Sequence, residues 1–153
     1  MSELNRMVAD IKISYHPKIK IRDCAKVKNG TDAATLFREN WDDTQIGFVE
    51  EMKVMLLNRG GRVLGIAAVS KGGMGGTYCD PKVIFCTALK AGASQIILAH
   101  NHPSGEIKPS QPDLRLTRKL CDGARLLELC VLDHIILTED RHLAFSEEGL
   151  MPG

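Results

Sequence analysis

The stretch Ala99-His100-Asn101-His102-Pro103-Ser104-Gly105, followed by Ser110 and Asp113, decides what this chain can be. The apolar run just before it, Ile96 to Ala99, predicts a buried strand. Side chains two residues apart on a strand point to the same face, so His100 and His102 project together. Asp113 can return from the far end of the loop as a third ligand. Three such ligands and one open position are typical of a catalytic zinc site, with one ion per chain.

Simpler structural roles are also open for these residues. A single histidine at a strand end is usually only a hydrogen-bonded polar residue. Ser110 and Asp113 precede leucines at helical spacing, which predicts a helix with Ser110 as N-cap and an acidic residue at N3. Losing such a cap costs only ~1 kcal/mol. Capping does not exclude ligation, because a carboxylate in the first turn can face the preceding strand, and we expect both roles.

The pattern H-x-H-P-x6-S-x2-D resembles the motif of the JAMM (MPN+) metalloproteases. The wider context, including Val131-Leu132-Asp133-His134-Ile135-Ile136, is similar to the bacterial RadC proteins, and the similarity runs from Phe48 to Leu150. The resemblance implies a zinc ion held by His100, His102, Asp113 and a water, which a glutamate from an earlier strand activates. It also implies a family labelled "DNA repair" whose motif is that of a peptidase. RadC proteins usually carry an N-terminal helix-hairpin-helix domain, for which the residues before Phe48 are too few.

Length and composition indicate an ordinary globular protein. The 153 residues suit one domain, with 44% hydrophobic and 25% charged residues. A net charge of +1 does not support nucleic-acid binding, which usually requires a clear basic excess. No apolar run approaches the ~20 residues of a membrane span, and the N-terminus lacks the apolar core of a secretory signal. We therefore expect a cytoplasmic protein without a membrane partner.

The cysteines also indicate a cytoplasmic protein. They are odd in number, scattered, and mostly within apolar segments, so we expect reduced thiols that pack as small hydrophobic groups. The absence of a C-x-x-C pair argues against a thiolate zinc site and against the zinc deaminase signature. The five are Cys24, Cys79, Cys86, Cys121 and Cys130.

The first 46 residues are predicted to form an N-terminal arm that precedes a metal-binding domain over residues 47–153. Met1 to His16 show weak periodicity and indicate either a loose arm or a partner-binding segment. Lys18 to Arg22 alternates basic residues with isoleucine, which predicts a half-buried strand. Its lysines either protect a sheet edge or contact nucleic acid. A short helix is expected from Thr31 to near Trp41.

The remaining segments predict a mixed sheet with helices against it. Together with the arm they follow the order β-α-β-β-α-β-α-β-β, an α/β single domain. The resemblance implies the same class, the three-layer MPN/JAB fold, which is cytidine deaminase-like. The glycine-rich segment Lys71 to Thr77 is interpreted as a flap beside the site, and Val83, Ile84, Ala88 and Leu89 as the apolar face of a helix. The predicted strands are 48–57, 62–70, 95–99, 130–138 and 142–145, and the predicted helices are 81–90 and 111–128.

Two adjacent glutamates compete for the role of catalytic base. On a strand, Glu50 shares a face with the apolar Met52 and Val54, whereas Glu51 shares the other face with Lys53. A carboxylate among apolar side chains is better suited to take a proton, so we predict Glu50 as the base. The alternative is that both glutamates are only the charged start of a strand.

Further polar residues receive provisional roles. Ser110 is predicted to donate a hydrogen bond to the oxyanion, and Asn101, which points away from the histidines, to fix the loop. Asp133 and His134 lie in an apolar run, where His134 is either a buried hydrogen-bonded residue or a partner that orients a ligand.

The function expected from the resemblance is hydrolysis of a peptide or isopeptide bond. The substrate is an unknown peptide or protein. One alternative is a nucleic-acid-processing enzyme, although nucleases tend to use carboxylate-rich sites, often with two metals. The other is a non-catalytic MPN-type scaffold. The sequence leaves the oligomeric state open.

Overall fold

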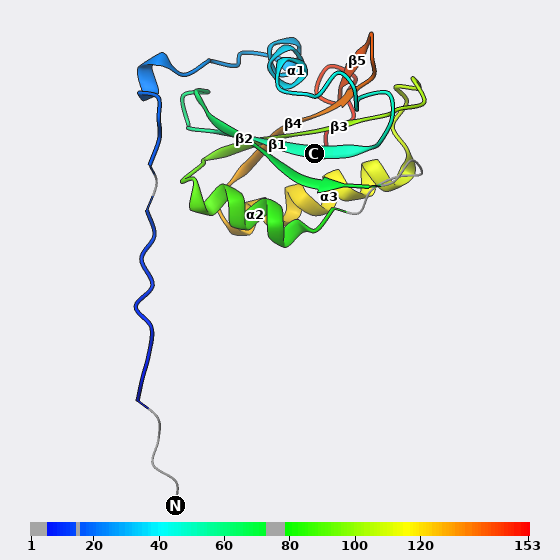
Figure 1. The fold of residues 1–153 in the computed structure, drawn as a ribbon. Coiled ribbons are helices and arrows are strands. Elements are labelled where there is room, and N and C mark those ends of the chain that lie inside the picture. Colours follow the sequence, from blue (N-terminus) through cyan, green and yellow to red (C-terminus); the bar gives the residue numbers. More distant parts are fainter. Residues whose placement is uncertain (1–5, 15, 73–78) are drawn as a thin grey trace, which may run out of the picture.

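A five-stranded mixed sheet forms the centre of the structure, a computed structural model that describes residues 6–14, 16–72 and 79–153 (Figure 1). In chain order the elements are η1 (Ile21–Asp23), α1 (Gly30–Glu39), β1 (Glu51–Leu57), β2 (Val63–Lys71), α2 (Pro81–Lys90), β3 (Gln95–Asn101), α3 (Gln111–Leu126), β4 (Cys130–Leu137) and β5 (His142–Ala144).

The strands lie in the order β2-β1-β3-β4-β5, which makes β2 and β5 the edges. Only β3 and β4 run parallel, whereas the other neighbours are antiparallel. A parallel pair needs a long crossover connection, and α3 supplies it. The end of β3 and the first turn of α3 therefore belong to one continuous connection.

Helices cover both faces of the sheet. α1 packs on one face, and α2 and α3 pack on the other (Figure 1). The sequence of β1 is almost continuously apolar because both faces of this strand are buried. Val54 and Leu56 enter the core beneath α2 and α3, while Met55 and Leu57 enter the core beneath α1. The predicted α/β class, a three-layer domain with a mixed sheet flanked by helices, is confirmed.

Each of α1, α2 and α3 begins after a residue whose side chain caps it, and for α3 this is the predicted Ser110. Asp80 accepts a hydrogen bond from the Lys82 N–H with Pro81 following it, and Asn29 caps α1 by accepting from the Asp32 N–H. Ser110 and Asp113 form a reciprocal capping box at the start of α3. The local chemistry of each helix start thus sets where the chain leaves the sheet.

The strand predicted over residues 18–22 is wrong. This segment ends in the short 3-10 turn η1, and Ile19 and Ile21 are 59% and 45% exposed. Alternation produces a strand only where one face can be buried and a neighbour supplies backbone partners. Backbone contact with the start of β2 comes instead from the residues that follow, where the Ala25 carbonyl accepts from the Val63 N–H and Lys26 bridges to Arg62.

Two strand limits also differ from the prediction. β1 begins at Glu51 rather than Phe48, because backbone groups of the preceding segment bond to the Asn101 side chain instead of a neighbouring strand. β3 continues through Asn101 rather than stopping at Ala99. The histidine motif therefore starts inside the sheet.

The predicted apolar face of α2 is only half right. Ile84 and Ala88, one turn apart, are fully buried, but Val83 and Leu89 are 41% and 52% exposed. The expectation of packed cysteines is likewise wrong for Cys86 and Cys130, which are exposed, although all five cysteines are free.

The N-terminal part divides into two kinds of structure. Residues 6–14 extend away from the sheet without helix or strand (Figure 1). In contrast, α1 buries Ala33 and Phe37 in the same core as Met55. The division of the chain at residue 46 stays a prediction. Of the predicted flap, residues 73–77 lie outside the described part of the chain.

Within the described ranges, no helix has both the length and the apolar character that crossing a membrane requires.

Candidate metal centre

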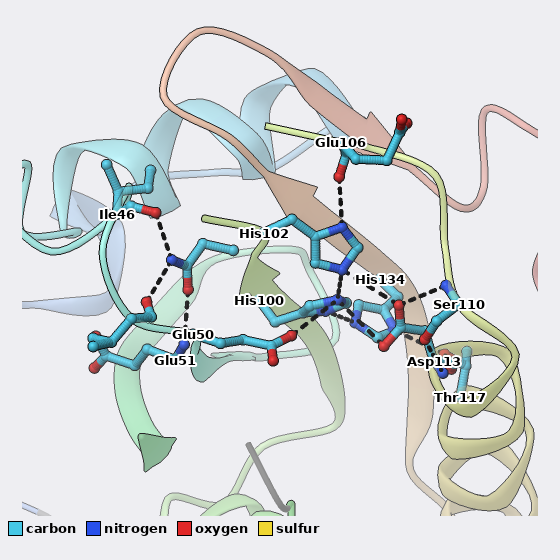
Figure 2. Close-up of polar contacts among 12 residues, drawn as sticks. Ile46, Glu50, Glu51, His100, His102, Glu106, Ser110, Asp113, Thr117 and His134 are labelled. Atoms are coloured by element: carbon cyan, nitrogen blue, oxygen red, sulfur yellow. Dashed lines mark hydrogen bonds and ion pairs between the residues drawn. The ribbon is translucent and has the colours of Figure 1, made fainter. Parts of the chain in front are cut away.

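The two motif histidines meet in the middle of the sheet. His100 pairs across the sheet with Met52 and faces the side of α2 and α3. His102 lies just beyond β3, where its backbone N–H still donates to the Leu137 carbonyl at 2.8 Å. The Nε2 atoms of the two rings are 2.9 Å apart (Figure 2). His100 is almost fully buried, and the His102 side chain is 16% exposed.

Asp113 reaches the histidines from the first turn of α3. Its Oδ1 lies 3.4 Å from Nε2 of His100, and its Oδ2 lies 3.4 Å from Nε2 of His102. The capping box also fixes this carboxylate, because the Ser110 N–H donates to Oδ2 at 2.8 Å. The side chain of Asp113 therefore takes part in the predicted capping box and also lies next to both histidines.

The spacing of these three groups fits a tetrahedral zinc ion. Zinc bonds of about 2.0–2.1 Å place neighbouring ligand atoms about 3.3 Å from each other. The Nε2 atoms of His100 and His102 are 2.9 Å apart, and each lies 3.4 Å from a different oxygen of the Asp113 carboxylate, Oδ1 for His100 and Oδ2 for His102. Glu50, His100 and His102 also form a wider group whose donor atoms lie within 4.8 Å of one another. We prefer Asp113 as the third ligand because its oxygens lie closer to both rings.

The positions of the hydrogens on the two imidazole rings also suit the binding of a cation between them. Nδ1 of His102 lies 2.7 Å from the Glu106 carbonyl, which can only accept, so this nitrogen carries the hydrogen. In a neutral ring, Nε2 is then a bare lone pair. It faces Nε2 of His100 and the acceptor oxygens of Asp113. This lone pair is satisfied either by a hydrogen on Nε2 of His100 or by a metal ion between the groups.

The pKa shifts follow from the same contacts. Burial alone would raise the pKa of Asp113, but its contacts with His100 and His102 hold that pKa far below its ordinary value. Burial would lower the pKa of His102, yet Asp113 and the Glu106 carbonyl raise it overall. Asp113 is therefore a carboxylate at neutral pH, and its negative charge favours a positive charge beside it, on the His102 ring or on a bound metal ion.

The two glutamates point in different directions. Oε1 of Glu50 lies 4.0 Å from Nε2 of His100, and its side chain is 18% exposed. The side chain of Glu51 points away from the histidines (Figure 2). Glu50 precedes Met52 by two residues, and Met52 lies opposite His100, so the period of the strand brings Glu50 to the site.

Asn101 holds the segment that carries Glu50. Its side-chain amide donates to the carbonyls of Ile46 and Val49, and its oxygen accepts from the Glu51 N–H, all at 2.7–2.8 Å. Asn101 is completely buried on the face opposite His100. The sequence predicts that Asn101 fixes a loop, and the structure shows that it fixes the backbone on both sides of Glu50.

Ser110 stands at the edge of the same site. Its Oγ accepts from the Asp113 N–H at 3.2 Å. Among the described residues, no acceptor is recorded for its own hydroxyl hydrogen, which remains available to a bound molecule. Its role toward an oxyanion stays a prediction.

His134 lies directly behind His100. Its Nε2 is 2.7 Å from Nδ1 of His100, and its Nδ1 is 2.7 Å from Oγ1 of Thr117. Burial, followed by the neighbouring His100, lowers the pKa of His134 well below its ordinary value, so the ring is neutral. Sequence reasoning left His134 open and missed Thr117. A signal for Thr117 existed, because it lies one turn after Asp113 on the buried stripe of α3.

A cavity of about 240 Å³ opens beside the site. Glu50, His100 and Asp113 lie on its polar side, and Lys119 and Cys79 also border it. Its apolar walls are formed by Met52, Pro81, Pro112 and Leu116. Two other cavities are larger, about 390 and 440 Å³, but none of the candidate metal-site residues lines them.

Comparison with known proteins gives one family match. The sequence model described as "RadC-like JAB domain" matches residues 27–150. The matched region starts before α1 and includes every residue of the candidate site.

Individual relatives share the same region at substantial identity. A UPF0758 protein of Flavobacterium johnsoniae is 43% identical over 101 residues, 66% of this chain and 44% of that protein. A UPF0758 protein of Porphyromonas gingivalis is 42% identical over 103 residues, 67% of this chain and 45% of that protein. A third, from Symbiobacterium thermophilum, is 37% identical over 105 residues, 69% and 45% of the two chains. The chain spans less than half the length of these curated relatives.

Proposed function

Because the chain belongs to the RadC-like JAB domain family, we propose that it is a zinc-dependent hydrolase that cleaves an amide bond in a peptide or isopeptide. The observation that carries the proposal is the meeting of His100, His102 and Asp113 at the spacing of zinc ligands. Three protein ligands leave a fourth position for a reacting molecule, as in catalytic rather than structural zinc sites. The names of the relatives do not specify a reaction.

His100, His102 and Asp113 would hold the ion, one per chain. When bound, zinc supplies a Lewis acid that lowers the pKa of water toward ~7 and polarises a carbonyl. In the neutral His102 ring, Nε2 faces the site without a hydrogen, because Nδ1 donates its hydrogen to the Glu106 carbonyl on the far side. Asp113 contributes a negative charge, which its helix cap fixes in place.

Glu50 and Ser110 would carry the proton transfer and the charge stabilisation. Glu50 lies close enough to His100 to accept a proton from the attacking water and to return it to the leaving amine. Ser110 has a hydroxyl hydrogen to offer the oxyanion, and such a donor is worth ~3 kcal/mol in other hydrolases. The apolar walls of the adjoining cavity suit a peptide side chain and keep bulk water from the polar groups.

The setting of this reaction is part of the proposal. Five free cysteines fit the reducing cytoplasm. The substrate would be a peptide or a protein, and we expect no association with a membrane. Association with nucleic acid is not supported by the net charge of +1.

Substitution of Glu50 by glutamine tests the proposal, with Glu51→Gln as the matched control on the neighbouring residue. We expect the Glu50→Gln protein to bind zinc normally but to lose about 10²–10⁴-fold in turnover, which is the usual contribution of a general base. The Glu51→Gln protein should behave as wild type. Cleavage is followed by mass spectrometry of a mixture-based peptide library incubated with each zinc-loaded protein.

Five results would contradict the proposal. Loss of zinc from Glu50→Gln would make Glu50 a ligand, and unchanged turnover would remove it from the reaction. A zinc-loaded wild-type protein that cleaves no library peptide would contradict peptide hydrolysis. Chelator-sensitive nicking of plasmid DNA would favour nucleic-acid processing instead, and failure to bind zinc would favour a non-catalytic scaffold.

A further inference from the structure

A chain of buried hydrogen bonds runs from the candidate metal centre into the core behind it. Nδ1 of His100 contacts Nε2 of His134 at 2.7 Å, and Nδ1 of His134 contacts the Thr117 hydroxyl at 2.7 Å. The hydroxyl in turn donates to the Asp113 carbonyl at 2.9 Å. None of the His100, Thr117 and His134 side chains is more than 1% exposed. Water therefore does not compete for these bonds.

The direction of every bond in this chain follows from its far end. The Asp113 carbonyl can only accept, so the single hydroxyl hydrogen of Thr117 points to it. Toward His134 the Thr117 oxygen can then only accept, which puts a hydrogen on Nδ1 of His134. A neutral imidazole has one N–H, so Nε2 of His134 is an acceptor. His100 must donate from its Nδ1, and its Nε2 is left with a lone pair.

The chain also closes into a ring that joins three elements. Asp113 and Thr117 lie one turn apart on α3, His134 lies on β4, and His100 lies on β3. The ring closes where Oδ1 of Asp113 approaches Nε2 of His100 at 3.4 Å. Phe145 stacks on the His134 ring with centroids 4.6 Å apart, which restricts its rotation. The relative position of two proposed ligands is thus tied to Thr117 and His134.

We infer that His134 and Thr117 are positioning residues that hold the metal-binding nitrogen of His100 unprotonated and directed at the ion. This inference rests on the proposed zinc site and assigns two residues outside the ligand set. A partner of this kind fixes the tautomer and orientation of a ligating histidine, and its loss typically costs 10–100-fold in metal affinity.

Replacement of Thr117 by valine tests the inference with little change in shape. Without the hydroxyl, Nδ1 of His134 has no acceptor. His134 can then move its hydrogen to Nε2, which forces His100 to keep a hydrogen on the metal-binding nitrogen. We expect Thr117→Val to weaken zinc binding by about 10–100-fold, as measured by competition with a chelator. Thr117→Ser keeps the hydroxyl and should bind zinc almost as wild type does.

A matched control separates this effect from a general loss of packing. Thr138 is also fully buried and hydrogen-bonded, but at the end of β4, where its hydroxyl contacts Asp140 and Arg141. Thr138→Val makes the same chemical change and should leave zinc affinity unchanged. Equal zinc affinity of Thr117→Val and the wild type would overturn the inference.

The proton positions provide a second readout that does not depend on activity. Long-range ¹H–¹⁵N correlation spectra identify which imidazole nitrogen carries hydrogen, and we expect Nδ1 for both His134 and His100 in the wild type. A hydrogen on Nε2 of His134 would overturn the inference even if Thr117→Val failed to fold. A wild-type protein that takes up no zinc would instead contradict the proposed function, and the metal-free spectrum would still decide the direction of the bonds.

Discussion

At the scale of single residues, neighbouring residues of the histidine motif face opposite sides of β3. His100 faces α3 and the candidate metal site, and its neighbour Asn101 faces the side of α1. Asn101 makes three backbone contacts around Glu50, whereas His134 and Thr117 support His100. Glu50, the proposed base, and His100, a proposed metal ligand, therefore have separate supports.

This separation predicts a specific phenotype for Asn101→Ala. The substitution removes the buried partners of Ile46, Val49 and Glu51, and a buried group left unpaired costs about 1–3 kcal/mol. We expect a lower free energy of unfolding and a loss of turnover through displaced Glu50, but nearly unchanged zinc affinity. Urea denaturation and chelator competition measure the two quantities on the same preparation.

Asn58 supplies the control for that experiment. Its side chain also accepts from a backbone N–H, that of Arg62, but in the turn between β1 and β2. Asn58→Ala should lower stability without affecting either zinc binding or turnover. A large loss of zinc affinity in Asn101→Ala would show that the two supports are not separate.

Residue patterns predicted the members of the site better than their supports. Local spacing was sufficient to predict that His100, His102 and Asp113 lie together, and the period of a strand was sufficient to predict that Glu50 lies beside them, while their roles stay predictions. The contact of His134 with His100 joins residues 34 positions apart in different strands. No local pattern encodes such a pairing, so the sequence left two interpretations of His134 open.

At the scale of elements, capping chemistry made the helices predictable. The starts of α2 and α3 follow directly from Asp80 with Pro81 and from Ser110. The isoleucines at 19 and 21 misled the prediction, because alternation specifies a face but not the presence of a neighbour to cover it. Element type follows from local pattern, whereas pairing depends on the whole sheet.

The start of α1 provides a test of packing between elements. A Cβ added to Gly30 would lie 2.6 Å from Cβ of Ala144 on β5, a contact that neither backbone can easily relieve. We expect Gly30→Ala to lower the free energy of unfolding by about 1–3 kcal/mol, the usual cost of overpacking. Denaturant titration measures this change.

Gly65 in β2 is the matched control, because a Cβ there meets no atom within 4 Å. Gly65→Ala should be neutral or slightly stabilising, since glycine in a strand costs about 0.5–1 kcal/mol relative to alanine. If the two variants had equal stability, the close approach of α1 and β5 would be refuted.

At the scale of the whole molecule, the order of the strands creates the site. β3 lies at the centre of the sheet between β1 and β4, so its end is bordered by Glu50 before β1, by His134 on β4 and by α3. The patterns of the single elements predicted a mixed sheet with helices against it, and the family resemblance implied the three layers. It could not show that these partners converge on one histidine, which depends on strand order.

The most direct test of the account is the zinc content of the folded protein after zinc loading and desalting. The wild type and the control variant Glu51→Gln should each retain about one zinc per chain, as three protein ligands and an open position require. His100→Ala and Asp113→Asn should retain almost none while remaining folded. A wild type without zinc, or ligand variants that keep a full equivalent, would contradict the metal centre and the hydrolase built on it.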